Sequence, residues 1–257
     1  MLGWKIFAHS VRIVFRNLRE ALQIGLVPSV AAAVFSAVVS SFTDQGTATE
    51  TGSLLSTSPE DAFLLFGTAV MSFIVTLWIF VAWHRFVLLE EYPTGWIPGF
   101  KADRFFDYVG YTFLLIVICV ISAVGFSMPV VLIVSLLSTT IPVLGSLAQF
   151  LPLIIVILVY VTFLRLGTVL PAAAIGAPFG LKAAKNATSG TNGTLIVTAT
   201  TMLIVQGVFG LILFQSSQLL PIVGIASQTI IGLIISLVNV SVLTTVYGIY
   251  VEKRELT

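Results

Sequence analysis

The sequence predicts an all-α fold, a polytopic membrane protein whose six-helix transmembrane bundle is built from three hairpins. Of its 257 residues, 58% are hydrophobic and only 9% are charged, whereas an ordinary soluble domain carries roughly 25% charged residues. The chain also contains six continuous apolar runs, and about 20 helical residues are enough to cross a ~30 Å hydrocarbon layer. Continuous runs favour helices over β-barrel strands, which alternate apolar and polar residues over about ten positions. A soluble globular domain is therefore excluded.

The expected spans follow these apolar runs, which cover residues 21–39, 63–82, 108–137, 147–166, 195–214 and 222–247. We treat residues 1–257 as a single transmembrane domain, with an interfacial amphipathic helix over 1–20 and the six-span bundle over 21–257. The stretch 108–170 is longer than two spans require. A third crossing would reverse the side on which the later basic residues lie, so we favour two crossings. The extra length is then either a long helix kinked at Pro129 or a short re-entrant piece around Pro142.

The basic residues sort to alternate connections. All twelve Lys and Arg precede the first span, follow the second, surround the end of the fourth or lie in the tail. The three other connections, 40–62, 138–146 and 215–221, contain none, and the first of them carries four acidic residues. By the positive-inside rule this pattern predicts that both termini are cytoplasmic.

The N-terminal segment has the pattern of an amphipathic helix. Seven apolar residues share one face of a helical wheel, namely Trp4, Phe7, Ala8, Val11, Val14, Phe15 and Leu18. His9 shares another face with the basic residues Lys5, Arg12, Arg16 and Arg19. We expect this helix to lie in the headgroup layer against anionic lipids of the cytoplasmic leaflet. It serves there as a topology anchor or, alternatively, as a lipid sensor or docking surface. Ile6 and Ile13 interrupt the polar side and are placed to touch protein instead.

Similar short basic segments precede the first, third and fifth spans, at residues 4–20, 99–107 and 178–190. They suggest three repeats of a basic interfacial segment followed by a hairpin, although apolar composition alone also produces such matches. The segment 178–190 has a proline where a first helical turn accepts it and a glycine where a helix end prefers it. A short interfacial helix is therefore expected there.

Three further residues are expected at the membrane interface: Trp83, Arg85 and Arg165. Trp83, His84 and Arg85, followed by Glu90 and Glu91, have the composition of a proton-handling cluster. The spacing equally fits a helix end, where tryptophan sits at headgroup depth and arginine reaches the phosphates, and we favour this interpretation.

Arg165 is the deepest basic residue in the predicted topology. We expect it to reach phosphate or to bond carbonyl groups near Pro171, because an unpaired buried charge is costly.

Few polar side chains lie deep in the predicted helices, and the candidates for an intramembrane role are Gln206, Gln228 and Asn239. No Asp or Glu is expected at mid-membrane, which weakens an ion-coupled transport hypothesis. Interhelical hydrogen bonds are the favoured role of these amides, and lining a substrate path is the alternative.

No catalytic constellation is visible in the sequence. Cys119 is the only cysteine, so an internal disulfide or a cysteine-based metal site is excluded. The two histidines lie far apart, and neither HExxH, GxSxG nor a phosphate-binding glycine loop is present. We expect no enzyme activity, no cofactor, no metal and no nucleic-acid partner.

Residues 160–174, Tyr-Val-Thr-Phe-Leu-Arg-Leu-Gly-Thr-Val-Leu-Pro-Ala-Ala-Ala, followed by Gly-Leu-Lys-Ala-Ala-Lys-Asn-Ala-Thr at 180–188 and Asn192, carry a loose resemblance. Together with the basic N-terminal helix and the six spans, they resemble bacterial inner-membrane proteins of the YciC type and the membrane domain of some glycerophosphodiester phosphodiesterases. This chain has Lys185-Asn186 where that pattern often has an aromatic residue and an arginine, and it has no phosphodiesterase domain. The resemblance implies a bacterial cytoplasmic membrane and supplies no catalytic residues.

The expected function is that of a non-catalytic inner-membrane protein, either an accessory or stabilising subunit of a membrane complex or a factor in envelope upkeep. Its expected partners are the lipid bilayer, anionic lipids and other membrane proteins. Transport of a small or lipid-like molecule is the alternative. A polar cavity lined by Gln206, Gln228 and Asn239 would favour transport, whereas a dry core with an apolar groove facing lipid would favour a partner role.

Overall fold

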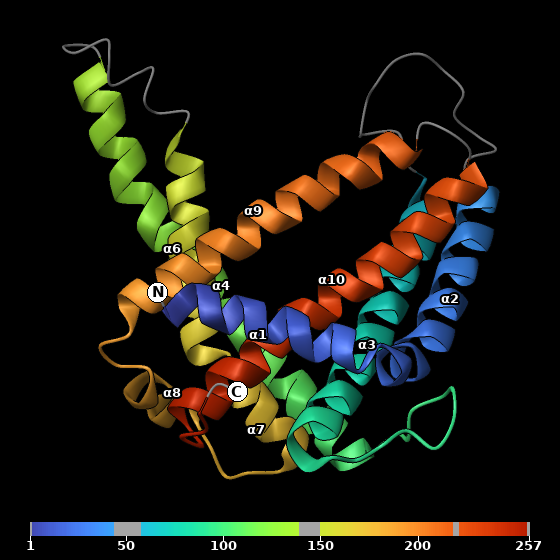
Figure 1. The fold of residues 1–257 in the computed structure, drawn as a ribbon. Coiled ribbons are helices and arrows are strands. Elements are labelled where there is room, and N and C mark those ends of the chain that lie inside the picture. Colours follow the sequence, from blue (N-terminus) through green and yellow to red (C-terminus); the bar gives the residue numbers. More distant parts are fainter. Residues whose placement is uncertain (1, 44–57, 139–149, 218–220, 256–257) are drawn as a thin grey trace.

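The computed structural model describes residues 2–43, 58–138, 150–217 and 221–255, and across these ranges the chain is all-α without strands. The helices are α1 (Leu2–Arg16), α2 (Leu18–Thr43), α3 (Pro59–Leu89), α4 (Ala102–Ser138), α6 (Leu151–Leu166), α7 (Val169–Ile175), α8 (Leu181–Ala187), α9 (Asn192–Ser217) and α10 (Pro221–Tyr250) (Figure 1).

Six helical segments in the described residues are long and apolar enough to span a membrane: α2, α3, α4, α6 together with α7, α9 and α10. The predicted six-helix, multi-pass architecture is therefore confirmed. The ambiguous stretch supplies two of these spans, as predicted, and α4 runs through Pro129 as one helix of 37 residues. The proposed re-entrant piece around Pro142 lies outside the described residues.

The spans pair as hairpins, because α2 packs on α3, α4 on α6 and α9 on α10. In Figure 1, α2, α4 and α9 end at the top, whereas α1, α7, α8 and the C-terminal end of α10 lie in the lower half. All twelve Lys and Arg belong to elements or helix ends of this lower half, which we call the basic end. The charge pattern read from the sequence thus corresponds to one end of the bundle.

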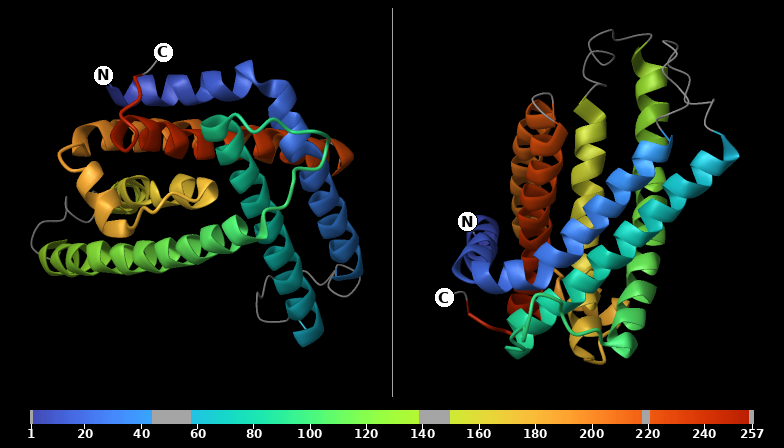
Figure 2. Two further views of the ribbon diagram at one scale, coloured as in Figure 1. Left: turned by 90° about the horizontal axis from the view of Figure 1, so that it is seen from below. Right: turned by 90° about the vertical axis from the view of Figure 1, so that its right-hand side faces the viewer.

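The protein core is concentrated at the basic end. Residues 169–174 of α7 are all buried, and α7 contacts α3, α4 and α10. The helices diverge toward the other end (Figure 2). There α4 has no buried residue between Ile116 and Leu136, whereas nearer the basic end it buries Phe105, Tyr108 and Leu115. The spans are therefore held together mainly at the basic end.

The N-terminal helix is shorter than predicted and packs on the bundle. It ends at Arg16, and the chain bends at Asn17, so Arg19 belongs to the first turn of α2 rather than to the same helix. Helix α1 lies across α9 and α10 and buries Gly3, Ile6, Phe7, Ser10 and Val14.

Only part of the apolar face predicted for α1 contacts protein. Phe7 and Val14 are buried, whereas Trp4 and Phe15 are exposed. Gly3 allows the close approach to α9, since a Cβ atom there would lie 2.5 Å from the Thr194 carbonyl oxygen. The part of this face that carries Phe7 and Val14 therefore contacts protein, whereas the part that carries Trp4 and Phe15 stays exposed. Ile6 touches protein, as its position on the wheel suggested.

The other two short basic segments differ from each other. The segment 178–190 contains the expected helix, α8. In the segment 99–107, residues from Ala102 onward already belong to α4, so no separate helix forms there. The second suggested repeat therefore has a basic segment before its hairpin but no separate short helix.

Candidate functional site

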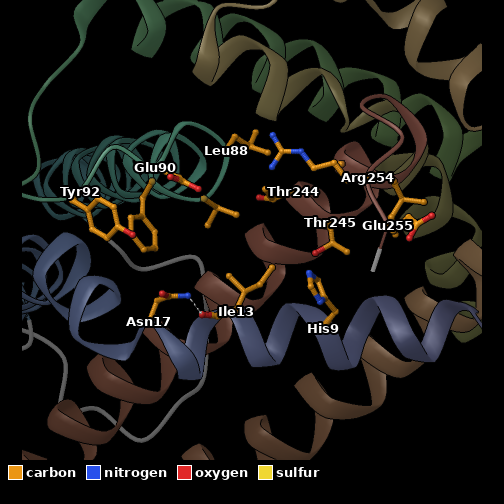
Figure 3. A pocket seen from close by; sticks show the side chains of 14 residues that line it. His9, Ile13, Asn17, Leu88, Glu90, Tyr92, Thr244, Thr245, Arg254 and Glu255 are labelled. Carbon is orange, nitrogen blue, oxygen red and sulfur yellow. Dashed lines mark hydrogen bonds between the residues drawn. The ribbon is translucent and has the colours of Figure 1, made fainter. Parts of the chain in front are cut away.

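A polar pocket of about 340 Å³ opens at the basic end between α1, the end of α3 and the end of α10 (Figure 3). Its polar lining comes from all three elements and the tail, and comprises His9, Asn17, Glu90, Tyr92, Thr244, Thr245, Arg254 and Glu255. The remaining lining is apolar, mostly from α3 and α10.

Two chain reversals bring the charged residues to this pocket. Helix α3 ends at Leu89, and the C-cap residue Glu90 adopts a left-handed conformation (φ 54°). Tyr92 then packs its ring edgewise against Phe86 at a centroid distance of 5.5 Å. After α10 the tail turns at Lys253 (φ 59°), and the Arg254 amide donates to the Gly248 carbonyl (2.9 Å). The Arg254 guanidinium consequently points back across the pocket toward Leu88 and Glu90 (Figure 3).

The pocket floor belongs to a buried polar network on α10. Ser241, Thr244 and Thr245 occupy positions i, i+3 and i+4 and share one face of the helix. Thr245 contacts the hydroxyl of Ser10 on α1 (3.0 Å), Thr244 contacts His84 Nδ1 on α3 (2.8 Å), and Ser241 accepts from the indole of Trp83 (2.8 Å). The network therefore joins α1 to the two candidate spans α3 and α10.

His84 is fully buried and uses both ring nitrogens. The Thr244 hydroxyl donates to the Val240 carbonyl (2.9 Å), so its oxygen accepts from His84 Nδ1–H. Nε2 is then the acceptor for the Tyr108 hydroxyl of α4, at 3.3 Å. This arrangement is that of a neutral core histidine. It does not support the proton-handling cluster, because Glu90 is exposed and Glu91 pairs with Arg85 instead.

Trp83 is enclosed by protein and does not contact lipid headgroups. It is fully buried, stacks at a tilt on Phe86 (5.3 Å between centroids) and donates to Ser241. The expectation that it anchors the protein in the interface was wrong, because the indole N–H has a hydroxyl partner inside the protein.

Arg85 acts inside the protein as well. Its side chain is 18% exposed and contacts Glu91 through Nε (2.7 Å) and Nη2 (2.5 Å). Its Nη1 donates to the Ala174 carbonyl near the end of α7 (3.1 Å), a group that lacks a partner within its own helix. Arg85 therefore links α7 to the loop after α3 through these contacts. Its guanidinium does not extend freely toward lipid phosphates.

Arg165 bonds through Nη2 to the side-chain oxygen of Asn192, the first residue of α9. The expected contact with carbonyls near Pro171 is absent among the described residues for Arg165 and is made by Arg85 instead. The Nε atom of Arg165 is buried and has no hydrogen-bond partner in the structure. This arginine joins the end of α6 to the start of α9.

The three intramembrane amides separate into two places. Asn239 on α10 accepts from Gln206 of α9 (2.9 Å) and from the hydroxyl of Tyr160 of α6 (2.8 Å). Gln228 lies instead at a crevice of about 350 Å³ between α2, α3 and α10. The predicted interhelical role is confirmed for Gln206 and Asn239, and the three amides do not share a cavity.

The remaining predicted interface residues lie on the outside of the protein. Trp4, Lys5, Arg12, Arg16 and Arg19 are all exposed. None of the four cations has an ion-pair partner among residues 2–43, 58–138, 150–217 and 221–255. These four positive charges are thus available to bind negatively charged groups outside the protein.

Sequence reasoning overlooked Ser10, Tyr108, Tyr160 and the hydroxyl residues of α10. The signal for the last group was the spacing of Ser241, Thr244 and Thr245, which puts three hydroxyls on one face of an otherwise apolar helix. Hydroxyls in transmembrane helices often bond only to their own backbone, so that spacing alone does not identify their partners on other helices.

The described geometry consists of an open polar pocket and of polar contacts that pack helices together. Among the described residues no group of three or more His, Cys, Asp or Glu side chains is placed to hold a metal ion. The polar pocket instead offers both charge signs and hydrogen-bonding groups on an open surface. No protein-family model matches this chain, and no curated protein or solved structure shows significant similarity to it.

Proposed function

We propose that this chain is a non-catalytic protein of the bacterial cytoplasmic membrane that serves as an accessory or stabilising subunit of a membrane complex or in envelope upkeep. Both termini lie in the cytoplasm, α1 contacts anionic lipids there, and other membrane proteins are its partners. The charge pattern supports this orientation, and the resemblance of residues 160–192 to YciC-type proteins supports the bacterial membrane.

One observation carries the proposal: polar side chains inside the bundle form hydrogen bonds that hold neighbouring helices together. Gln206 and Asn239 join α9 to α10, while Trp83 and His84 join α3 to α10. A transport path needs polar groups facing a common cavity, yet the crevice beside Gln206 is otherwise lined by apolar side chains. This is the arrangement that favours a partner role.

The polar pocket is the proposed contact with a cytoplasmic segment of the partner. In-cell photo-crosslinking tests this directly, with a photoreactive residue at Tyr92 in the pocket and a control at Ala183, an exposed residue of α8. We expect a protein adduct of defined mass from position 92, which Arg254→Gln weakens. Tagging that partner should in turn retrieve this chain. Adducts with lipid alone at position 92 would contradict the proposal.

Transport of a small or lipid-like molecule is the second candidate, favoured by the crevice at Gln228. Its lining is rich in hydroxyl groups, contributed by Ser29, Ser72, Thr76, Thr229 and Ser236. Proteoliposomes containing a fluorescent phospholipid test this alternative. Flux that requires this protein and that Gln228→Leu reduces would support it, and flux equal to that of empty liposomes would exclude lipid movement.

A further inference from the structure

An apolar crevice lies between α9 and α10 and is closed by α1. Its volume is about 340 Å³, within the range of ligand pockets, roughly 300–1,000 Å³. Figure 1 shows α9 and α10 enclosing an angle that α1 crosses. Ten of the eleven lining residues are apolar, among them Phe15, Met202, Val205 and Ile234. The exception, Gln206, donates its amide hydrogen to Asn239.

Water is a poor occupant of this crevice. A buried water needs two to four polar partners, and apolar cavities stay dry and accept apolar guests. An acyl chain fits the lining chemically. Within a bilayer, however, an acyl chain gains little from apolar contact alone, because the surrounding lipid is equally apolar. Selective retention therefore requires recognition of the headgroup.

The basic residues of the same helix, α1, supply that recognition. Phe7, Val11 and Phe15 line the crevice from α1, and Arg12 is adjacent to Val11 in sequence and three residues before Phe15. Arg12 and Arg16 are exposed, and neither has an acidic partner in the part of the chain that the structure describes. One helix thus carries apolar groups into the crevice and, on another face, exposed positive charge without an acidic partner among the described residues.

We propose that this crevice binds one acyl chain of an anionic glycerophospholipid, whose phosphate is held by Arg12 and Arg16. The acyl chain would lie between α9 and α10 and would contact the apolar side chains of α1. This deepens the proposed contact between α1 and anionic lipid by giving it a defined site, and it does not depend on the accessory role.

The test uses the full-length protein in mild detergent with equimolar phosphatidylglycerol and phosphatidylcholine, and native mass spectrometry to count retained lipids. We expect one phosphatidylglycerol to be retained preferentially. Arg12→Gln and Arg16→Gln should each reduce this retention roughly 5-fold, as expected for one basic residue near an anionic lipid. Lys182→Gln and Lys185→Gln on α8 are the matched controls and should leave the tightly retained lipid in place.

A second pair of variants tests the crevice itself. Ile234→Trp fills it and should abolish the tightly retained lipid, whereas Ile212→Trp, on the exposed surface of α9, should not. Phe15→Ala, which removes part of the lining, replaces Ile234→Trp if that variant does not fold and should weaken retention.

The outcomes separate the two claims about lipid. Equal retention of both lipids by the unmodified protein would overturn the proposed anionic-lipid contact altogether. Retention that depends on Arg12 and Arg16 but is unaffected by the crevice variants would overturn only the crevice site, because the lipid would then bind on the surface.

Discussion

The indole nitrogen of Trp83 donates a 2.8 Å hydrogen bond to the hydroxyl of Ser241, 158 residues later in the chain. Both side chains are fully buried. The bond connects α3 to α10, and it lies beside the contacts that join His84 to Thr244 and Ser10 to Thr245. This end of the bundle is therefore held by a polar network as well as by apolar packing.

Removing the Trp83–Ser241 bond should destabilise the protein measurably. We expect Trp83→Phe to lower the free energy of unfolding by about 1–3 kcal/mol, because it removes both indole volume and a donor whose partner stays buried. Ser241→Ala should cost less. The double variant should reveal a coupling of about 0.6–1.7 kcal/mol, the range for hydrogen bonds between membrane helices. Reversible unfolding in mixed micelles measures these values, and strict additivity would contradict the bond.

Arg85 should resist conservative replacement, because a lysine ammonium cannot reproduce its contacts with Glu91 and the Ala174 carbonyl. We expect Arg85→Lys to lower the free energy of unfolding by about 1 kcal/mol and Arg85→Leu to lower it further. Lys101→Gln is the matched control. Its Nζ lies 3.8 Å from the same Glu91 and is more exposed, so its loss should cost under about 0.5 kcal/mol. Equal effects at both positions would argue against the role assigned to Arg85.

The contact between Gly3 and α9 predicts a local effect on α1. In Gly3→Ala the added methyl group would approach the Thr194 carbonyl oxygen, so α1 must shift away and lose burial of Ile6 and Ser10. We expect faster hydrogen exchange in residues 2–16 with the six spans intact. A Cβ at Gly210 within α9 meets nothing within 4 Å, so Gly210→Ala should leave that exchange unchanged. Unaltered exchange in Gly3→Ala would show that α1 is held by lipid rather than by protein.

Much of the fold was readable from the sequence because bilayer thickness fixes the length of an apolar run and the basic residues gather in alternate connections. The residues at the ends of the spans were harder to interpret. Tryptophan near the end of an apolar run suits either a headgroup contact or a buried hydrogen bond, and only the position of Ser241 decides between them for Trp83. A helical wheel likewise does not distinguish lipid from protein, so the burial of Phe7 and the exposure of Phe15 depend on where α9 and α10 lie.

The candidate site was less predictable still. Two of its charged residues, Glu90 and Arg254, lie more than 160 positions apart. They line the same pocket only because α3 and the tail both reverse direction at the basic end. Interhelical hydrogen bonds were expected for Gln206 and Asn239, since polar groups in spans bond across helices, but their pairing with each other was not. The third partner, Tyr160, depends on the packing of α6 against α9.

The central claim is that the basic end, which carries α1 and the polar pocket, faces the cytoplasm. Cysteine labelling in intact cells with a permeabilised outer membrane tests it most directly, in a background where Cys119, the only cysteine, is replaced by serine. A cysteine at Thr49 should react with an impermeant maleimide, and one at Ala183 should react only after the cytoplasmic membrane is opened. Labelling at position 183 but not at position 49 in intact cells would contradict the orientation and, with it, the proposed cytoplasmic contact.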